Sequence, residues 1–438
     1  MRVQLITQYW WPHDGVPHRR WSWITEALVK NGHQVTVVTP VAGKERGWNG
    51  LRSILREFLS HRTVAAEIGP QGESIYRVPA SKHSDSLVKR AFNQGMVAFN
   101  SLVMVLVIWR NASRGMRPHL IVGTVPALPT AIATWLASRI TDTPYVVDLR
   151  DAWPQLLEEV SRWDEVRGKP TALRSTIFRR GIKVSTGLVK ILMHRIYREA
   201  DGIIVTAETL GESLLDGGML EKSDLFILRN VYPTPLRPKT YYPASQSAKR
   251  SLKVLYAGKI GRAQDLTTVL EAVSLAAERG YSIALRVRGT GAGLQQARDL
   301  ADRLGISVDF GETVARQALQ EDFDWADTAL VHLRNWPALH QAVPSKTFEL
   351  MRQKIHITGV VAGETADLIR TLGAGHVVPP GDYHGLAELW AYLLENPDEL
   401  VVGDRARRWV ISTEKEELRL FPAYLERLVE NARVERTM

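Results

Sequence analysis

The chain has 438 residues, of which 45% are hydrophobic and 24% are charged, and it contains no cysteine. This length suggests two domains, each large enough to bury its own core. The lack of cysteine excludes disulfides, thiolate metal sites and a cysteine nucleophile. The N-terminus lacks the long apolar stretch of a signal peptide, so we expect a cytoplasmic protein.

The net charge of +9 is unevenly distributed. Residues 1–250 hold 34 Lys and Arg against 21 Asp and Glu, a net charge of +13. Residues 251–438 hold 22 against 26, a net charge of −4. This asymmetry predicts that the N-terminal half faces an anionic partner, which could be nucleic acid, a membrane surface or a phosphorylated substrate.

Short apolar strands alternate with helical segments along the whole chain. In the N-terminal half, strands are expected at Val3–Thr7, Gln34–Thr39, Ser74–Val78, Leu120–Gly123, Tyr145–Leu149, Gly202–Thr206 and Leu225–Leu228. In the C-terminal half, they are expected at Leu252–Tyr256, Ser282–Val287, Ser307–Phe310, Thr328–Leu333 and Ile355–Thr358. Continuous apolar strands separated by helices predict parallel sheets covered on both faces.

A proline-rich segment divides the two series of strands. Residues 230–251 read NVYPTPLRPKTYYPASQSAKRS, with four prolines and no hydrophobic periodicity, which is typical of a linker or hinge. The predicted fold is therefore α/β, with two Rossmann-like, doubly wound domains. We expect an N-terminal domain at 1–235, a linker at 236–251 and a C-terminal domain at 252–400, followed by a helical segment at 401–438 that packs back on the N-terminal domain.

Two basic segments contain no acidic residue, Ser86–Thr141 and Val166–Arg198. The apolar run Val97–Trp109 within the first is shorter than the roughly 20 residues that span a bilayer, and it is expected to be a core-facing helix. The segment 166–198 holds nine Lys or Arg interleaved with apolar residues, a pattern that favours contact with a membrane surface over a simple solvated face. Nucleic acid is not expected as a partner, because no nucleic-acid-binding motif accompanies this charge.

The loop AGKIGRAQ follows the predicted strand 252–256. Ligands of open α/β sheets bind beyond the carboxyl ends of the strands. Gly258 allows close approach of the backbone, Lys259 and Arg262 supply positive charge, and a helix begins directly behind them. The loop is thus a candidate diphosphate cradle; the alternative is an ordinary turn with two exposed bases.

The segment VPSKTFE at 343–349 is a second candidate site at the start of a helix. Pro344 and Ser345 leave backbone N–H groups free for an anion, and Lys346 adds charge. Glu349 lies one turn further on and could accept hydrogen bonds from sugar hydroxyls. The alternative is that Ser345 is only an N-cap and Glu349 a surface acid.

Two further loops belong to the N-terminal half. The loop WWPHDG at 10–15 offers Trp11, His13 and Asp14 as candidate substrate-binding residues. The segment DLRDAWP at 148–154 places charged side chains at the end of an apolar strand, where core packing does not explain them. Arg150 and Asp151 are therefore expected to be functional, with a structural ion pair between them as the alternative.

Several other patterns are set aside. The sequence GTGAG at 289–293 lacks the spacing and the downstream acid of a dinucleotide fingerprint, and it is interpreted as a tight turn between strand and helix. The acidic pair in DFD at 322–324 is interpreted as solvated helix acids. The twelve histidines show no metal-ligand spacing, so no metal site is expected.

The order of these motifs resembles the retaining glycosyltransferases of family 4, which have the two-domain GT-B fold. The resemblance covers nearly the whole chain and includes the WWP loop, NGHQVTVVT, VVDLRDAWP, YAGKIGRAQDL, VRGTGAG, WADTALVHL, VPSKTFELM and GETADLI. The motif forms look like the branch that acts in capsule, O-antigen and exopolysaccharide assembly. That branch extends lipid-linked sugars at the inner face of the cytoplasmic membrane, which implies a peripheral membrane location here.

The resemblance implies a nucleoside diphosphate-sugar donor, a lipid-linked saccharide acceptor and no cofactor or metal. Glu349 matches the second acid of the family's E-x7-E motif, which holds the donor ribose, and Lys259 matches the base that neutralises the diphosphate. Arg150 falls where many members have a histidine near the transferred sugar. The implied donor-binding residues are Gly15, Gly258, Lys259, Arg262, Gln341, Pro344, Ser345, Lys346 and Glu349, and the implied catalytic residues are Arg150, Asp151, Lys259 and Arg262. Trp11, His13 and Asp14 are the candidates for the acceptor side.

The chain departs from the family pattern at three places. Gln341 replaces the first acid of E-x7-E, Gln264 replaces the second base after the glycine loop, and RQKIH replaces the usual turn after Glu349. Two other classes of function therefore remain open. One is a catalytically silent protein that binds nucleotide sugars or acts as a scaffold, and the other is a different GT-B enzyme, such as an epimerase or an inverting transferase.

Overall fold

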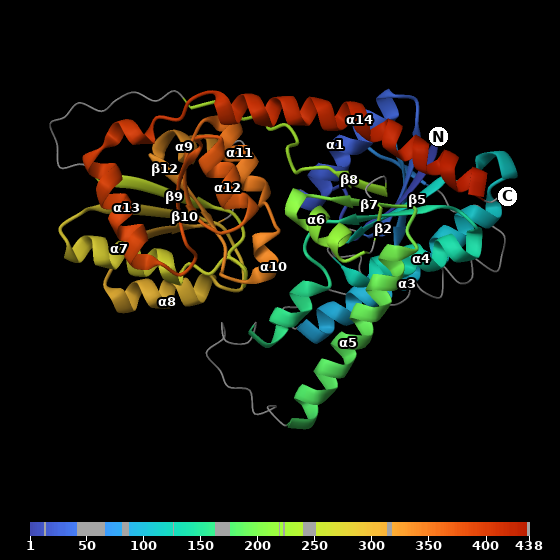
Figure 1. The fold of residues 1–438 in the computed structure, drawn as a ribbon, viewed down its shortest axis with the longest axis horizontal. Coiled ribbons are helices and arrows are strands. Elements are labelled where there is room, and N and C mark those ends of the chain that lie inside the picture. The colour runs from blue at the N-terminus through green and yellow to red at the C-terminus, as the bar shows by residue number, and fades with distance from the viewer. Residues whose placement is uncertain are drawn as a thin grey trace. The chain divides into compact units, whose positions relative to one another are not determined.

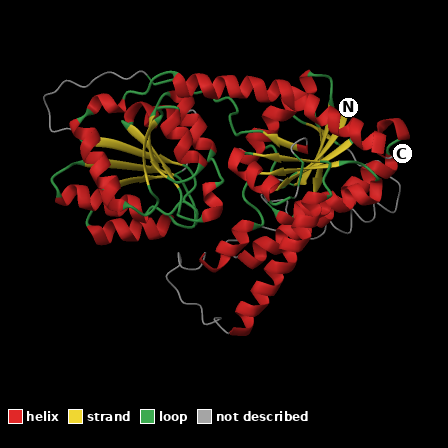
Figure 2. Ribbon diagram, viewed as in Figure 1, coloured by secondary structure: helices red, strands yellow, loops and turns green. Residues whose placement is uncertain are grey.

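The computed structural model describes residues 1–12, 15–41, 66–80, 87–125, 127–162, 176–218, 220–221, 224–239, 251–312 and 318–435. The chain forms two compact units. The first consists of Met1–Pro154, Arg174–Tyr232 and Glu416–Met438, and the second of Gln155–Leu173 and Pro233–Lys415. The second unit thus includes Gln155–Leu173, which the expected boundary of 1–235 places in the N-terminal domain. Each unit is an α/β layer structure with a central sheet (Figures 1 and 2).

The first unit contains an eight-stranded sheet in the order β3-β4-β2-β1-β5-β6-β7-β8. The strands are β1 (Arg2–Ile6), β2 (Gln34–Pro40), β3 (Glu67–Ile68), β4 (Ser74–Val78), β5 (Leu120–Val125), β6 (Tyr145–Leu149), β7 (Gly202–Val205) and β8 (Leu225–Ile227). All neighbours are parallel except β3 and β4. The central strands are buried along their whole length, which explains why they read as continuous apolar runs.

The helices of the first unit connect these parallel strands. They are α1 (Val16–Lys30), α3 (Leu87–Asn111), α4 (Leu128–Thr141), α5 (Thr176–Arg198) and α6 (Glu208–Asp216), with a 3₁₀ turn at Arg114–Met116. Helix α1 begins at Val16 and has Pro17 in its first turn, where a missing N–H costs nothing. Helix α4 packs between α3 and α5 on one face of the sheet (Figure 1).

Helix α3 contains the apolar run Val97–Trp109. Within the described residues, Lys89–Asn111 is the one segment long and apolar enough to cross a membrane, and 39% of its most apolar window is buried. The buried residues include Val97, Met104 and Val105, which face the sheet and α4, as expected for a core-facing helix. Phe92 and Phe99 remain 59% and 53% exposed.

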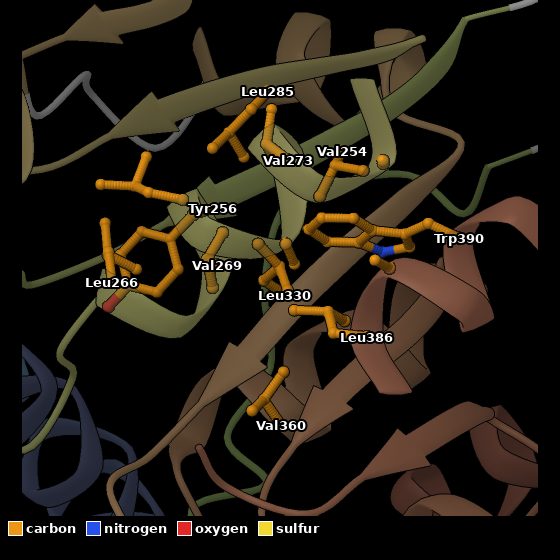
Figure 3. Packing of buried hydrophobic residues seen from close by; sticks show 14 of the residues in the cluster. Val254, Tyr256, Leu266, Val269, Val273, Leu285, Leu330, Val360, Leu386 and Trp390 are labelled. Atoms are coloured by element: carbon orange, nitrogen blue, oxygen red, sulfur yellow. The ribbon is translucent and has the colours of Figure 1, made fainter. Parts of the chain in front are cut away.

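The second unit contains a six-stranded parallel sheet in the order β11-β10-β9-β12-β13-β14. Its strands are β9 (Leu252–Ala257), β10 (Ile283–Arg288), β11 (Val308–Gly311), β12 (Thr328–His332), β13 (His356–Val360) and β14 (Gly375–Val378). Its helices are α7 (Thr267–Glu278), α8 (Leu294–Leu304), α9 (Leu319–Trp325), α10 (Pro337–His340), α11 (Ser345–Gln353), α12 (Glu364–Thr371) and α13 (Tyr383–Glu395), and 3₁₀ turns occur at Gln155–Arg162 and Pro397–Leu400. Helix α7 packs between α8 and α13 over a core that includes Tyr256, Leu330 and Trp390 (Figure 3).

Helix α14 (Arg405–Glu435) ends the described chain and contains Pro422. Its residues from Glu416 onward belong to the first unit, where Phe421 and Tyr424 form an aromatic cluster with Phe226. The Tyr424 hydroxyl donates to Asp224 O at 2.7 Å, and Glu417 Oε2 accepts from the backbone N–H of Arg229 at 2.9 Å. These contacts fix the last helical turns on the edge of the first sheet near β8.

Candidate active site

The glycine loop after β9 is held by the loop after β10. The N–H of Gly258 donates to Arg288 O at 2.9 Å, and that of Ile260 donates to Thr290 O at 3.0 Å. A Cβ atom on Gly289 would lie 1.9 Å from Gly258 O, and one on Gly291 would lie 2.1 Å from Ile260 O. The GTGAG sequence therefore forms the tight turn that was predicted, and its glycines allow the two loops to pack directly against each other.

Lys346 in the first turn of α11 reaches the same glycine loop. Its Nζ lies 3.9 Å from the centre of the Tyr256 ring, and a Cβ on Gly258 would lie 2.9 Å from this atom. The ammonium is buried and has no hydrogen-bond partner among the described residues. Burial lowers the pKa of Lys346 to about 7, although the nearby Glu349 carboxylate raises it. The structure thus brings together the two predicted phosphate-binding segments, around a buried ammonium that has no hydrogen-bond partner among the described residues.

The start of α11 leaves its backbone donors free of side-chain caps. Pro344 is the N-cap residue, and its side chain offers no acceptor, so no side-chain cap hydrogen bond forms at this end of the described helix. Ser345 is the first helical residue, so the interpretation of Ser345 as the N-cap is wrong. With no acidic residue in the first turn, the uncapped N–H groups and the helix dipole favour an anion beside Lys346.

His332 at the end of β12 is a polar residue of this region that the sequence reasoning missed. The side chain is buried, and both ring nitrogens lack a hydrogen-bond partner among the described residues. The pKa of His332 is lowered to about 4, mainly by burial and also by the nearby Lys346 and Arg334, while Asp265 acts to raise it. Its position in the sequence could have indicated it, because His332 is the polar residue that ends the apolar strand TALVH, and ligands of open α/β sheets bind at this carboxyl end of the strands.

The other predicted residues of the second unit lie around this centre. Gln341 is the C-cap of α10, and its Oε1 is buried without a partner among the described residues. Lys259 is exposed, whereas Arg262 and Glu349 are half-buried. A small pocket beside the glycine loop is lined by Ile260, Gly261, Gln264, Asp265, Leu266, Thr267, Gly293, Gln296 and Ala297. Gln264, which replaces the second base of the family pattern, thus lines a pocket next to the predicted cradle.

The acidic pair in DFD differs from its prediction. Asp322 is buried and accepts from Arg286 Nη1 at 2.9 Å, with Arg288 Nε 3.4 Å away. Asp324 pairs at the surface with Arg237. Interpreting both as solvated helix acids is therefore wrong for Asp322, which compensates arginines projecting from β10.

In the first unit, the charged cluster at the end of β6 separates into two parts. Asp148 is fully buried; its Oδ1 accepts from Arg20 Nη2 at 3.1 Å and its Oδ2 from Trp21 Nε1 at 2.7 Å. This network ties α1 to β6, so Asp148 is structural. Arg150 and Asp151 lie at the carboxyl edge of the sheet, and no ion pair joins these two described side chains.

The N-terminal loop contributes two described residues. Gly15 is the N-cap of α1, and Trp11 is 43% exposed. His13 and Asp14, the other two acceptor-side candidates, lie outside the described residues. The side chains of residues 176–185 of α5, and all of residues 163–175, also lie outside them, so the basic segment 166–198 is described only in part.

Both halves of the chain match family models. Residues 15–226 match the Glycosyl transferase 4-like domain, and residues 239–415 match Glycosyl transferases group 1. The fold and these matches define a glycosyltransferase with the GT-B fold. The chain combines a glycosyl transferase 4-like N-terminal domain with a group 1 glycosyltransferase C-terminal domain. No curated protein sequence matches the chain closely enough to count as a relative.

Solved structures share the fold at low sequence identity. Sucrose-phosphate synthase from Thermosynechococcus elongatus is 14% identical, with all of both chains covered and a TM-score of 0.63. HepE from Anabaena, solved in complex with UDP-glucose, is 12% identical over 97% of this chain and 100% of its own, with a TM-score of 0.60. The lipopolysaccharide outer core galactosyltransferase WaaB is 12% identical over 97% and 99%, with a TM-score of 0.54.

Proposed function

We propose that the protein transfers a hexose from a nucleoside diphosphate-sugar to a hydroxyl group, with retention at the anomeric carbon. The observation that carries this proposal is the buried Lys346 ammonium, which lies between the glycine loop and the uncapped start of α11. A diphosphate is the ligand whose charge this arrangement would compensate. The complex of HepE with UDP-glucose supports a donor of this class.

The reaction needs stabilisation of the leaving group more than it needs an acid. When the bond between the anomeric carbon and the diphosphate breaks, negative charge develops on the departing phosphate oxygen. Lys346, together with Lys259 and Arg262, would stabilise that charge without a metal ion. Each preorganised donor of this kind could lower the barrier by roughly 2–4 kcal/mol.

Retention follows if the acceptor hydroxyl attacks from the face that the diphosphate leaves. The new bond joins the acceptor oxygen to the anomeric carbon, and the hydroxyl proton passes to the departing phosphate oxygen. The protein then has to hold both substrates and exclude water, which would otherwise hydrolyse the donor. Glu349 and Gln341 would bind hydroxyl groups of the donor.

The acceptor is proposed to be a lipid-linked saccharide of cell-surface polysaccharide assembly, reached at the inner face of the cytoplasmic membrane. Two features of the first unit support a membrane contact. Helix α5 carries bases in its last turn and exposes Leu188 and Ile191, which are 64% and 69% accessible. Helix α3 exposes Phe92 and Phe99, and exposed apolar side chains beside bases suit the interface of an anionic bilayer.

Thermal stabilisation across a panel of nucleotides and nucleotide sugars tests the proposal. A ligand present at 100 times its dissociation constant stabilises the folded state by about 2.7 kcal/mol. We expect one nucleoside diphosphate to stabilise the wild type without added metal and Glu349→Ala to lose most of this effect. Glu388→Ala is the matched control, since Glu388 is a 68% exposed helix acid that pairs with Arg279 at the surface.

The same panel separates the alternatives. No response to any nucleotide would favour a scaffold, and Gln341 would then mark a lost donor site. A response accompanied by an inverted product, or by an epimerised nucleotide sugar in NMR spectra, would exclude the retaining transfer.

A further inference from the structure

Arg150 is fixed at the carboxyl edge of the first sheet, directly after β6. Its backbone N–H donates to Val125 O at the end of β5 at 3.4 Å, and its carbonyl accepts from Thr206 Oγ1 just after β7 at 3.0 Å. The residue is therefore held between the ends of two strands. This is the edge at which open α/β sheets bind their ligands.

The guanidinium of Arg150 lacks the acceptors that a buried arginine requires. Nε and Nη1 are buried, and neither has a hydrogen-bond partner among the described residues. Burial lowers the pKa of Arg150 from its usual value. Because arginine stays protonated in proteins, the site holds a positive charge with two buried nitrogen donors that no acceptor among the described residues satisfies.

The carboxylates of Asp148 and Asp151 act to raise the pKa of Arg150, but neither of these described side chains forms a hydrogen bond or ion pair with its guanidinium. Both oxygens of Asp148 are already bonded to Arg20 and Trp21. Asp151 forms no ion pair with Arg150, and burial raises the pKa of its carboxyl group. The other groups that act on Arg150 electrostatically are the cation of Arg20 and the phenol of Tyr232.

The adjacent helix start adds to the positive potential. Helix α4 begins at Leu128, shortly after β5, and its N-cap, Ala127, offers no side-chain acceptor. The first turn of α4 contains no acidic residue. The helix dipole therefore favours negative charge at the same edge of the sheet.

We propose that Arg150 forms a subsite for a carboxylate or phosphate group carried by one of the two sugar substrates. A guanidinium presents parallel N–H donors that match either group. The inference rests on the proposed glycosyl transfer, and it adds that one substrate carries an anionic group besides the donor diphosphate. The anion could belong to the acceptor, or to a donor whose sugar is itself acidic.

The first test measures stability without ligand. If Arg150 serves a substrate and not the fold, Arg150→Gln should leave the melting temperature unchanged or raise it, because a buried charge without a partner is removed. Arg150→Lys keeps the charge but not the paired donors. A melting temperature lowered by several degrees in both variants would show that Arg150 is structural and would overturn the proposal.

The second test measures binding by NMR titration with methyl glucuronide, glucose 1-phosphate and uncharged methyl glucoside, each in the presence of saturating UDP, GDP or ADP. We expect at least one anionic sugar to bind the wild type, and to bind Arg150→Gln about 10- to 100-fold more weakly. Lys30→Gln is the control, since Lys30 is a 72% exposed cation at the far end of α1. Such a result would place the anion on the acceptor.

Whether the anionic group belongs to the donor sugar is tested by comparing the binding of UDP-glucuronate with that of UDP-glucose. A preference for the acidic donor that Arg150→Gln abolishes would place the anion on the donor sugar. Equal binding of charged and uncharged sugars in both experiments, or binding that Arg150→Gln does not weaken, would overturn the subsite. Stabilisation by nucleoside diphosphates that persists in Arg150→Gln would show that the proposed function survives such a failure.

Discussion

Replacing Lys346 by methionine separates the effect of this residue on the stability of the folded protein from its effect on nucleotide binding. Methionine keeps the length of the apolar stem and can still pack on Tyr256, but it removes the buried ammonium. Burial lowers the pKa of Lys346 from 10.5 to about 7. At about 1.4 kcal/mol per pKa unit, this corresponds to an upper bound of roughly 5 kcal/mol against the charged form in the folded state.

The sign of this effect can be followed with pH. Since the pKa is lower in the folded than in the unfolded state, the unfolded chain binds more protons between pH 7 and 10.5. The contribution of Lys346 to stability therefore rises with pH across that window and is most unfavourable below pH 7. Lys346→Met should remove this dependence and raise the stability of the ligand-free protein near pH 6 by about 1–4 kcal/mol, in line with other replacements of buried charges.

Binding should change in the opposite direction. The nucleoside diphosphate that stabilises the wild type best should bind Lys346→Met about 10²- to 10³-fold more weakly, as for the loss of a buried, preorganised donor. In the wild type, binding should weaken above pH 7, because the diphosphate requires the ammonium form. Thermal scans from pH 6 to pH 9, with and without the nucleotide, measure both effects.

The result that would refute this reasoning is a variant that is less stable at pH 6 and binds the nucleotide as the wild type does. Lys346 would then support the fold through Tyr256 and would have no role in the donor site. Lys253→Met is the matched control. Lys253 is an exposed lysine in β9 of the same unit, and its loss should alter neither property.

Three further predictions concern the loops, the core and the surface. Gly291→Ala should destabilise the protein by about 2 kcal/mol or more and abolish its stabilisation by nucleotides, because the added Cβ would lie 2.1 Å from Ile260 O. Gly403→Ala is the control: a Cβ there would have nothing within 4 Å, so thermal scans should show no change in stability. Asp148→Asn should cost about 3–5 kcal/mol by leaving the buried Arg20 without its carboxylate, and equal stability in denaturant titrations of variant and wild type would contradict this. Replacing Arg179, Arg180 and Lys183 by serine should reduce binding to anionic liposomes without affecting nucleotide binding, and undiminished sedimentation with the liposomes would exclude the basic helix as the membrane contact.

The sequence predicted most of the local structure because its signals are local. Twelve strands were expected from apolar runs bounded by turn residues, and each lies at or within about two residues of its observed place. The two missed strands are short. Glu67–Ile68 has two residues, and Gly375–Val378 begins with a glycine and is followed by prolines, so neither produces an apolar run.

Pairwise contacts over long distances in the chain could not be predicted in the same way. The glycine loop and VPSKTFE each suggested a phosphate site, but only the tertiary structure shows that Gly258 must be a glycine because the Lys346 ammonium lies against it. The same holds for the DLRDAWP segment. Its carboxylates look alike in the sequence, yet Asp148 is bound by Arg20 and Trp21 while Asp151 is not.

The sequence by itself determined the alternation of strands and helices, the two α/β domains and the loops that carry polar side chains, because hydrophobic periodicity and turn residues act over a few positions. The tertiary structure decided which of those polar side chains have hydrogen-bond partners and which, among the described residues, have none. That distinction depends on burial and on partners more than 80 residues away, as for Lys346 beside Gly258, and no local pattern encodes it. Only the tertiary structure shows that buried nitrogens of Lys346 and Arg150 lack hydrogen-bond partners among the described residues, and these are the two places where we propose that anionic groups of the substrates bind.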